Sequence, residues 1–118
     1  MNILSLGCGP SPDLMAFEQI NNSNKNISYL GYDINACWAS IHSEIKQYLK
    51  PQNNIQCNYE PKDAFDIFEN TTTVFTNINV IVMSYFLSSI PDLERAKKVP
   101  LLFNLIIEKI LLHSKRII

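Results

Sequence analysis

The sequence has no strong excess of charge of either sign. Its 118 residues include 10 Lys and Arg against 11 Asp and Glu, which gives a formal net charge of −1 at pH 7. Wrapping a nucleic acid or coating an anionic membrane would require a clustered basic face, so neither function is indicated. The apolar fraction of 47% is typical of a globular chain. This length predicts one domain over residues 1–118.

Cysteine and histidine are too few and too widely spaced for a recognisable metal site. The chain has three cysteines, Cys8, Cys37 and Cys57, and two histidines, His42 and His113, with no C-x-x-C pair. We therefore predict no metal ligands. Each cysteine is expected to behave as a small buried hydrophobic residue. Both histidines are expected on the surface, His42 on the polar side of a helix.

The chain also lacks a long apolar run and a leader of the secretory type. Its longest apolar stretch, 101–112, is interrupted by Asn104, Glu108 and Lys109 and is far shorter than the roughly 20 residues that a spanning helix needs. No basic segment precedes the first apolar residues, as it would in a signal peptide. We expect no membrane segment and a cytoplasmic location.

Strand-like and helix-like periods alternate along the sequence. Strands are predicted at 3–6, 27–32, 55–59 and 79–86, and helices at 11–20, 35–49, 63–68, 89–98 and 100–113. Ser11 is expected to cap the first helix through its hydroxyl. The strand 55–59 is predicted at a sheet edge and 79–86 in its centre. The pattern predicts an α/β fold with a doubly wound, mostly parallel sheet and helices on both faces.

The end of the sequence suggests a partial domain. A fifth strand is predicted to begin at 117–118, where the given sequence stops, so we expect the C-terminal strands to be incomplete. The preceding helix, predicted over 101–113, is apolar almost all round. Large exposed apolar surfaces usually mark interfaces, so this helix is a candidate contact in a homo-oligomer.

The loop after the first strand is the first candidate for a ligand site. Gly7 and Gly9 lack a Cβ and allow the backbone to approach a ligand closely, and a helix N-terminus that favours anions follows them. Asp33 lies 26 positions after Gly7, at the end of the second strand, where a carboxylate can accept hydrogen bonds from both hydroxyls of a ribose. Together the two features predict a ligand that contains adenosine.

These residues also resemble a known family. Residues 3–10, ILSLGCGP, are similar to the first motif of the Rossmann-like, or class I, S-adenosylmethionine-dependent methyltransferases, and 29–33, YLGYD, resemble the second. The likeness continues through 63–64 and 80–87. It departs from the family at Ser5, where an acidic residue is common, and at Ser11, where a third glycine is common.

The resemblance implies S-adenosylmethionine as cofactor and methyl transfer to an acceptor that the sequence does not identify. By this likeness the cofactor-binding residues are Gly7, Cys8, Gly9, Asp33, Ile34, Asp63, Ala64 and Ser84. The backbone around Gly7 and Gly9 would hold the methionine end, Asp33 the ribose hydroxyls, and Asp63 with Ala64 the adenine edge. Ser84 would lie near the transferred methyl group, and Ser84 and Tyr85 are the candidate catalytic residues.

Two alternatives remain open at this point. An NAD(P)-dependent oxidoreductase shares the strand, glycine loop, helix and acidic strand end. Its fingerprint, however, has glycine or alanine where this chain has Pro12. The other alternative is a non-catalytic Rossmann-like interaction module, because fold alone does not determine function.

Overall fold

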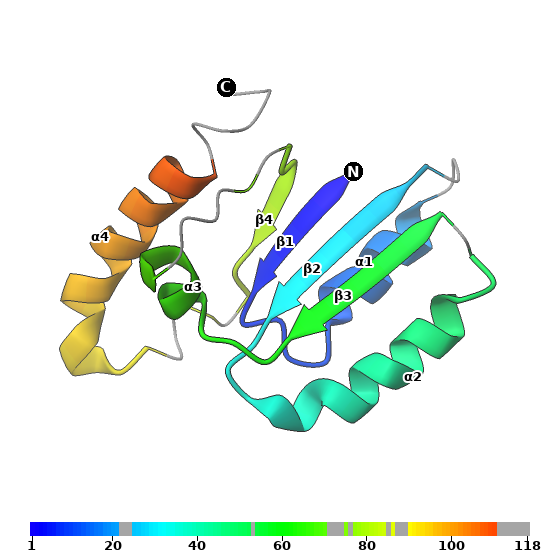
Figure 1. Cartoon of the computed structure of the whole chain (residues 1–118), viewed down its shortest axis with the longest axis horizontal. Helices are drawn as coiled ribbons and strands as arrows, with labels where there is room; N and C mark the ends of the chain where they lie inside the picture. The colour runs from blue at the N-terminus through cyan, green and yellow to red at the C-terminus, as the bar shows by residue number, and fades with distance from the viewer. Residues whose placement is uncertain are drawn as a thin grey trace.

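The centre of the protein is a parallel sheet. The computed structural model describes residues 1–21, 25–52, 54–70, 75, 77–84, 86 and 90–110. Its four strands lie in the order β3-β2-β1-β4 and all adjacent pairs are parallel (Figure 1). The strands are β1 (Asn2–Leu6), β2 (Ile27–Tyr32), β3 (Ile55–Glu60) and β4 (Val80–Val82). The predicted edge position of β3 is confirmed.

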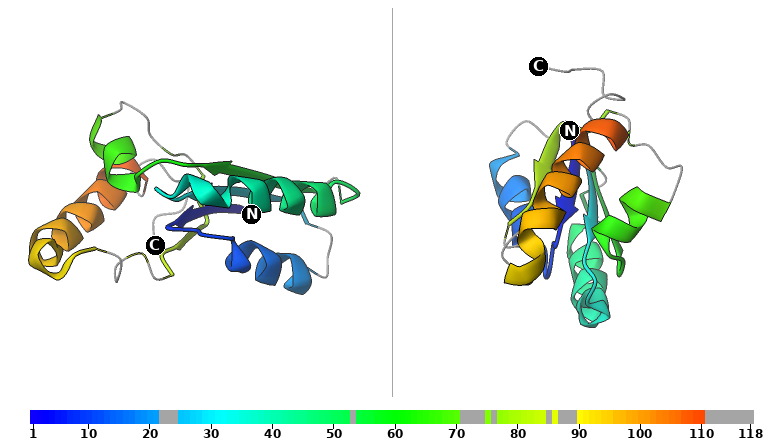
Figure 2. Two further views of the ribbon diagram at one scale, coloured as in Figure 1. Left: turned by 90° about the horizontal axis from the view of Figure 1, so that it is seen from below. Right: turned by 90° about the vertical axis from the view of Figure 1, so that its left-hand side faces the viewer.

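Helices cover both faces of this sheet, as Figure 2 shows in two further views. They are α1 (Pro12–Ile20), the short 3-10 helix η1 (Ala36–Trp38), α2 (Ala39–Leu49), α3 (Ala64–Asn70) and α4 (Asp92–Lys109). Neighbouring residues of β1 face opposite layers. Ile3 belongs to one buried cluster with Leu14 of α1 and Leu49 of α2. Leu4 belongs to a second cluster with residues of α3 and α4. The predicted α/β class is confirmed.

The strand order reverses beside β1. The chain proceeds from β1 to β2 and β3 on one side, and β4 then pairs with the other side of β1 through Ile3, Leu4 and Ser5. In doubly wound sheets, ligands bind beyond the carboxyl ends of the strands at such a reversal. The topology therefore directs attention to the loops that follow β1, β2 and β3.

The fourth strand is shorter than the sequence predicts. Pairing covers only Val80–Val82 of the predicted 79–86, and β4 is at an edge of the described sheet, so the predicted central position is wrong for the described strands. Its partner β1 ends at Leu6, one residue beyond the last pair Ser5–Val82, and then turns into the glycine loop, so β1 offers no partner to the chain beyond Met83. The Phe86 N–H donates to the carbonyl of Met83 in a turn instead.

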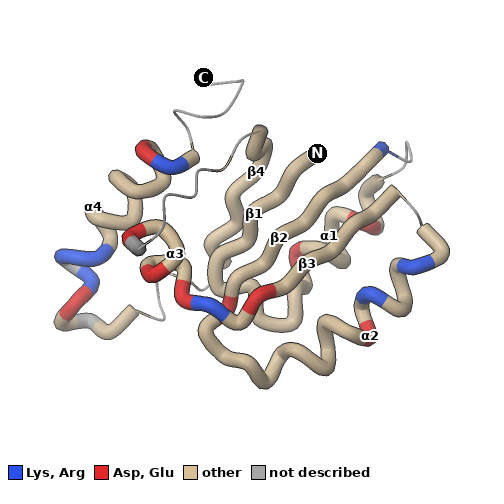
Figure 3. The backbone as a smooth tube through the Cα atoms, viewed as in Figure 1, with Lys and Arg blue, Asp and Glu red and all other residues tan. Residues whose placement is uncertain are grey.

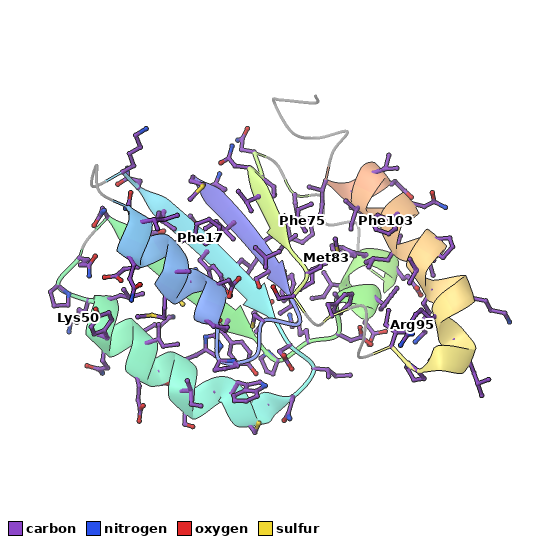
Figure 4. All side chains as sticks on the ribbon, turned by 180° about the vertical axis from the view of Figure 1, so that it is seen from behind. Phe17, Lys50, Phe75, Met83, Arg95 and Phe103 are labelled. Atoms are coloured by element: carbon purple, nitrogen blue, oxygen red, sulfur yellow. The ribbon has the colours of Figure 1, made fainter. Side chains whose placement is uncertain are left out.

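A single long helix replaces the two predicted at 89–98 and 100–113. α4 runs from Asp92 to Lys109 with Pro100 inside it. Proline removes one i→i−4 hydrogen bond and normally kinks or ends a helix. Here Leu102, Leu105 and Ile106 are buried against the rest of the core, and this burial offsets the lost bond. Phe75 and Met83 belong to the same cluster and lie between β4 and α4 (Figure 4).

Only part of the apolar surface of α4 is buried in this core. Four large apolar side chains of the helix remain exposed, namely Leu93, Leu101, Phe103 and Ile107. A contact between copies through this helix stays a prediction. The start predicted at Ser89 for the helix 89–98, the end predicted at His113 for the helix 100–113, and the strand predicted at 117–118 lie outside the described residues. No helix of the described part has both the length and the hydropathy needed to cross a bilayer.

Candidate functional site

The glycine loop after β1 is tightly folded against the end of β2. Gly7 and Gly9 both take positive φ, 66° and 52°, in a region that glycine enters without the steric cost of a Cβ. The backbone N–H groups of Gly7 and Cys8 both donate to the carbonyl of Tyr32, at 2.8 and 3.1 Å. A Cβ on Gly7 would lie 3.0 Å from the ring of Phe86. The backbone of Gly7 therefore lies directly against the ring of Phe86.

Asp33 joins this loop to the loop after β2. Its Oδ2 accepts the Gly9 N–H at 2.9 Å and its Oδ1 accepts the Asn35 N–H at 2.9 Å. A carboxylate offers about four lone-pair positions, so two remain for a ligand. The backbone bonds fix the orientation of the carboxylate before any ligand arrives.

The loop after β3 supplies a third wall. Asp63 caps α3, because its Oδ1 accepts the Phe65 N–H at 2.9 Å and its carbonyl accepts the N–H of Ile67 at 3.1 Å. Capping by aspartate is a common way to start a helix. Ala64 is buried next to it. The cap places the second oxygen of Asp63 and the side of Ala64 at the same edge of the sheet as Asp33.

These three loops surround one cavity of about 400 Å³, a volume within the usual range for small-molecule sites. Its lining consists of Gly7, Tyr32, Asp33, Ile34, Lys62, Asp63, Ala64, Phe65, Phe86, Ile90, Pro91 and Lys98. Charges of both signs follow one another where β3 ends and the chain enters α3 (Figure 3). Ile34 is an exposed apolar residue on this wall, with 73% of its surface open to solvent.

The structure brings together five of the eight residues predicted to bind the cofactor. Gly7, Asp33, Ile34, Asp63 and Ala64 line the cavity. Cys8 and Gly9 do not line it: the Cys8 side chain is buried in the cluster with Ile3 and Leu14, and the Gly9 N–H bonds to Asp33. Ser84 is exposed in the turn after β4 and is not part of the lining. Tyr85 lies outside the described residues.

Sequence reasoning missed one side of the cavity. Phe86, Ile90, Pro91 and Lys98 come from the segment after β4 and from α4. Phe86 stacks on Phe65 with ring centroids 5.9 Å apart, and the Lys98 ammonium lies 5.3 Å above the Phe65 ring. Which turn of α4 faces the sheet is set by tertiary packing.

The prediction that His42 is a surface residue is wrong. Its side chain is only 3% exposed, and its Nε2 lies 2.7 Å from the carbonyl oxygen of Gly9. The imidazole stacks on the ring of Tyr59 at 4.2 Å with an interplanar angle of 8°. The signal was present in the sequence, because His42 shares helical spacing with Ile45 and Leu49. The buried face of α2 passes through these residues, and Ile41 lies at its margin.

Ser11 does not cap α1 as predicted. It takes a left-handed conformation with φ 56° and makes no side-chain bond to the helix. Its buried Oγ lies 2.9 Å from the Tyr29 hydroxyl, which is also 3.0 Å from Asp13 Oδ1. The phenol has one hydrogen, and a carboxylate can only accept. The Tyr29 hydrogen therefore goes to Asp13, and the Ser11 hydroxyl donates to Tyr29. This polar network connects the end of the glycine loop to β2 and α1.

The three cysteines divide by burial. Cys8 and Cys57 are buried, which confirms the prediction, whereas Cys37 is exposed, so the prediction is wrong there. Burial raises the pKa of the Cys8 thiol to about 12 and also raises the pKa of Cys57. The thiolate is the nucleophilic form of cysteine. Neither buried thiol is therefore an activated nucleophile.

This difference predicts how the native protein reacts with a thiol reagent. At pH 8 we expect Ellman's reagent to modify Cys37 only, and Cys37→Ser to abolish the reaction until denaturant is added. Modification of Cys8 in the native protein would contradict this burial.

The raised pKa of Cys8 also predicts that the free energy of unfolding falls as pH rises above about 9 toward 12. Across that range the unfolded thiol loses its proton and the folded one keeps it, so the unfolded state binds fewer protons. Urea unfolding between pH 8 and pH 10 measures the decline.

Among the described residues, no three side chains of His, Cys, Asp or Glu are grouped so that they could hold a metal ion. The charged groups of the described cavity lining are two carboxylates, Asp33 and Asp63, and two ammonium groups, Lys62 and Lys98. This set is suited to hydroxyl and amino groups of an organic ligand.

Solved structures show the same fold. An O-methyltransferase domain, StiE O-MT residues 961–1257, superposes with a TM-score of 0.55 at 19% sequence identity over 92% of this chain. A longer form of that domain, residues 942–1257, gives a TM-score of 0.52 at the same identity. The chain spans about a third of the solved domain, 33% in each case. No family model and no curated protein sequence matches the chain. The fold is therefore methyltransferase-like.

Proposed function

We propose that this chain binds S-adenosylmethionine in the cavity beyond β1, β2 and β3 and acts in methyl transfer. One observation carries the proposal: the glycine loop and Asp33, 26 positions apart in sequence, border the same cavity as Asp63 and Ala64. The methyltransferase-like fold supports it. At 19% identity the likeness concerns the fold, so the cofactor argument comes from the chain's own residues.

The residues of the cavity fit the parts of this cofactor. Asp33 is oriented by two backbone bonds and keeps two acceptor positions for the two hydroxyls of a ribose. Ile34 presents an exposed apolar side chain, and Ala64 a small one, to a flat base. The second oxygen of Asp63 can accept a hydrogen bond from an exocyclic amino group. Gly7 and Phe86 line the cavity together, and this side of it would receive the methionine end.

The chemistry requires little more from the protein than alignment. The cofactor supplies a methyl group that its sulfonium already activates. The chain must hold the donor, orient an acceptor and exclude water, and each of these lowers the barrier without a dedicated base. Phe65, Phe86 and Ile90 give the far side of the cavity an apolar surface suited to excluding water. The acceptor is bound by groups that the present site does not specify.

The proposal can be tested by isothermal titration calorimetry of the chain with three ligands: S-adenosylmethionine, S-adenosylhomocysteine and NAD(H). We expect binding of the first two and no measurable heat for NAD(H), because Pro12 stands where the dinucleotide fingerprint has a small residue. Binding of NAD(H) alone would replace the proposal by the oxidoreductase alternative. Absence of binding by all three ligands would favour the non-catalytic module. Binding without methyl transfer to any acceptor would restrict the chain to cofactor binding.

A further inference from the structure

The peptide groups on both sides of Gly9 are each held by a side chain from another element. The Gly9 N–H donates to Asp33 Oδ2 at 2.9 Å, and the Gly9 carbonyl lies 2.7 Å from His42 Nε2. A carbonyl can only accept, so Nε2 carries the hydrogen and donates it. Glycine has more backbone freedom to lose than any other residue. Two tethers, one on each side of its Cα, remove that freedom.

These contacts form a closed ring across four segments of the chain. The imidazole of His42 stacks on Tyr59 of β3 at 4.2 Å, and the Tyr59 hydroxyl donates to the carbonyl of Asn35 at 2.8 Å. The Asn35 N–H in turn donates to Asp33 Oδ1, whose partner oxygen accepts from Gly9. The ring joins the glycine loop, the loop after β2, α2 and β3. Asp33 is the only member of the ring that also lines the cavity.

The environment of His42 favours a donor role for this side chain. The side chain is 3% exposed, and its second nitrogen, Nδ1, is buried without a hydrogen-bond partner. The hydrogen bond of the described ring is therefore made through Nε2, which donates to the Gly9 carbonyl. Ser11 Oγ, at 3.3 Å, is a more distant neighbour of the same nitrogen.

From this geometry we propose that His42 is a positioning residue for the cofactor site. It fixes the carbonyl of the peptide that follows Gly9 through Nε2–H, which limits rotation about the Gly9 Cα and so holds the N–H of the preceding peptide toward Asp33, where it sets the direction of the carboxylate. The inference rests on the proposed function only where it concerns cofactor affinity. The hydrogen-bonded state of Gly9 itself does not depend on any ligand.

Two variants of similar length separate hydrogen bonding from packing. His42→Gln keeps a side-chain N–H that can reach the Gly9 carbonyl, whereas His42→Met has the same unbranched shape and no donor. Both residues are good helix formers, so α2 should persist in each. Ser43→Ala, an exposed position one residue further along α2, is the matched control.

The chain has three glycines, so selective ¹⁵N-glycine labelling gives a spectrum of three amide signals that reports on Gly9 without any ligand. We expect His42→Met to shift the Gly9 amide signal upfield and to speed its hydrogen exchange, and His42→Gln to keep both close to wild type.

The Kd for S-adenosylmethionine should rise about 5- to 10-fold in His42→Met, as expected for loss of one hydrogen bond. In His42→Gln it should stay within about 2-fold of wild type, because the glutamine N–H can replace the lost donor.

Each result of these measurements either supports or contradicts the positioning role of His42. Equal behaviour of the Gln and Met variants, including equal unfolding of both, would overturn the proposal and leave His42 as a packing residue. An unchanged Gly9 amide in His42→Met would overturn it as well. If the wild-type chain does not bind S-adenosylmethionine, the proposed function fails. A change in the Gly9 amide signal in His42→Met but not in His42→Gln would still support the positioning role of His42.

Discussion

Replacing Asp33 by alanine should raise the Kd for S-adenosylmethionine by about 100-fold or more, because hydrogen bonds to a charged group contribute about 1.5–3 kcal/mol each and two such bonds to the ribose are lost. The substitution removes the two free acceptor positions of the carboxylate. It also frees the N–H groups of Gly9 and Asn35, which lose their shared partner. Calorimetry at one salt concentration measures the change.

Asp66→Ala is the control for this experiment. It removes the same charge from an exposed position of α3 that does not line the cavity. Its Kd should stay within about 2-fold of wild type, since exposed charges are well screened. If Asp33→Ala binds as tightly as Asp66→Ala, the assignment of the ribose site is wrong, even if the protein binds the cofactor elsewhere.

The largest effect on stability is expected from Phe68→Ala. The Phe68 side chain is fully buried, and its ring meets Phe75 edge to face at 5.7 Å. Phe75 in turn contacts Tyr32 at 6.4 Å, so Phe68 links α3 to the end of β2. Truncating a buried phenylalanine to alanine costs about 3–5 kcal/mol. This is a large part of the roughly 5–15 kcal/mol by which a typical domain is stable.

Urea unfolding followed by circular dichroism measures this loss. Leu93→Ala on α4 is the comparison, because its side chain is 97% exposed and surface substitutions usually change stability by less than about 0.5 kcal/mol. A difference of less than 1 kcal/mol between the two variants would show that α3 does not pack on the sheet as described.

Part of the site was predictable because it depends on local chemistry. The glycines of the first loop and the acidic residue after the second strand stand where a parallel sheet always brings loops together. Asp63 and Ala64 were placed by the family likeness, and the structure puts both on the same cavity. That these residues bind the cofactor stays a prediction until ligand binding is measured.

The alternation of strand and helix periods alone determined the α/β class and the edge position of β3, because side-chain periodicity is a property of the chain itself. Only the tertiary structure decided that β4 pairs over Val80–Val82 alone, beside a partner strand that ends at Leu6, and that α4 continues through Pro100. It also decided which groups the buried His42 contacts, namely the Gly9 carbonyl and the Tyr59 ring. Each of these depends on a partner far away in sequence, and the packing energy of that partner exceeds the local preference of the residue.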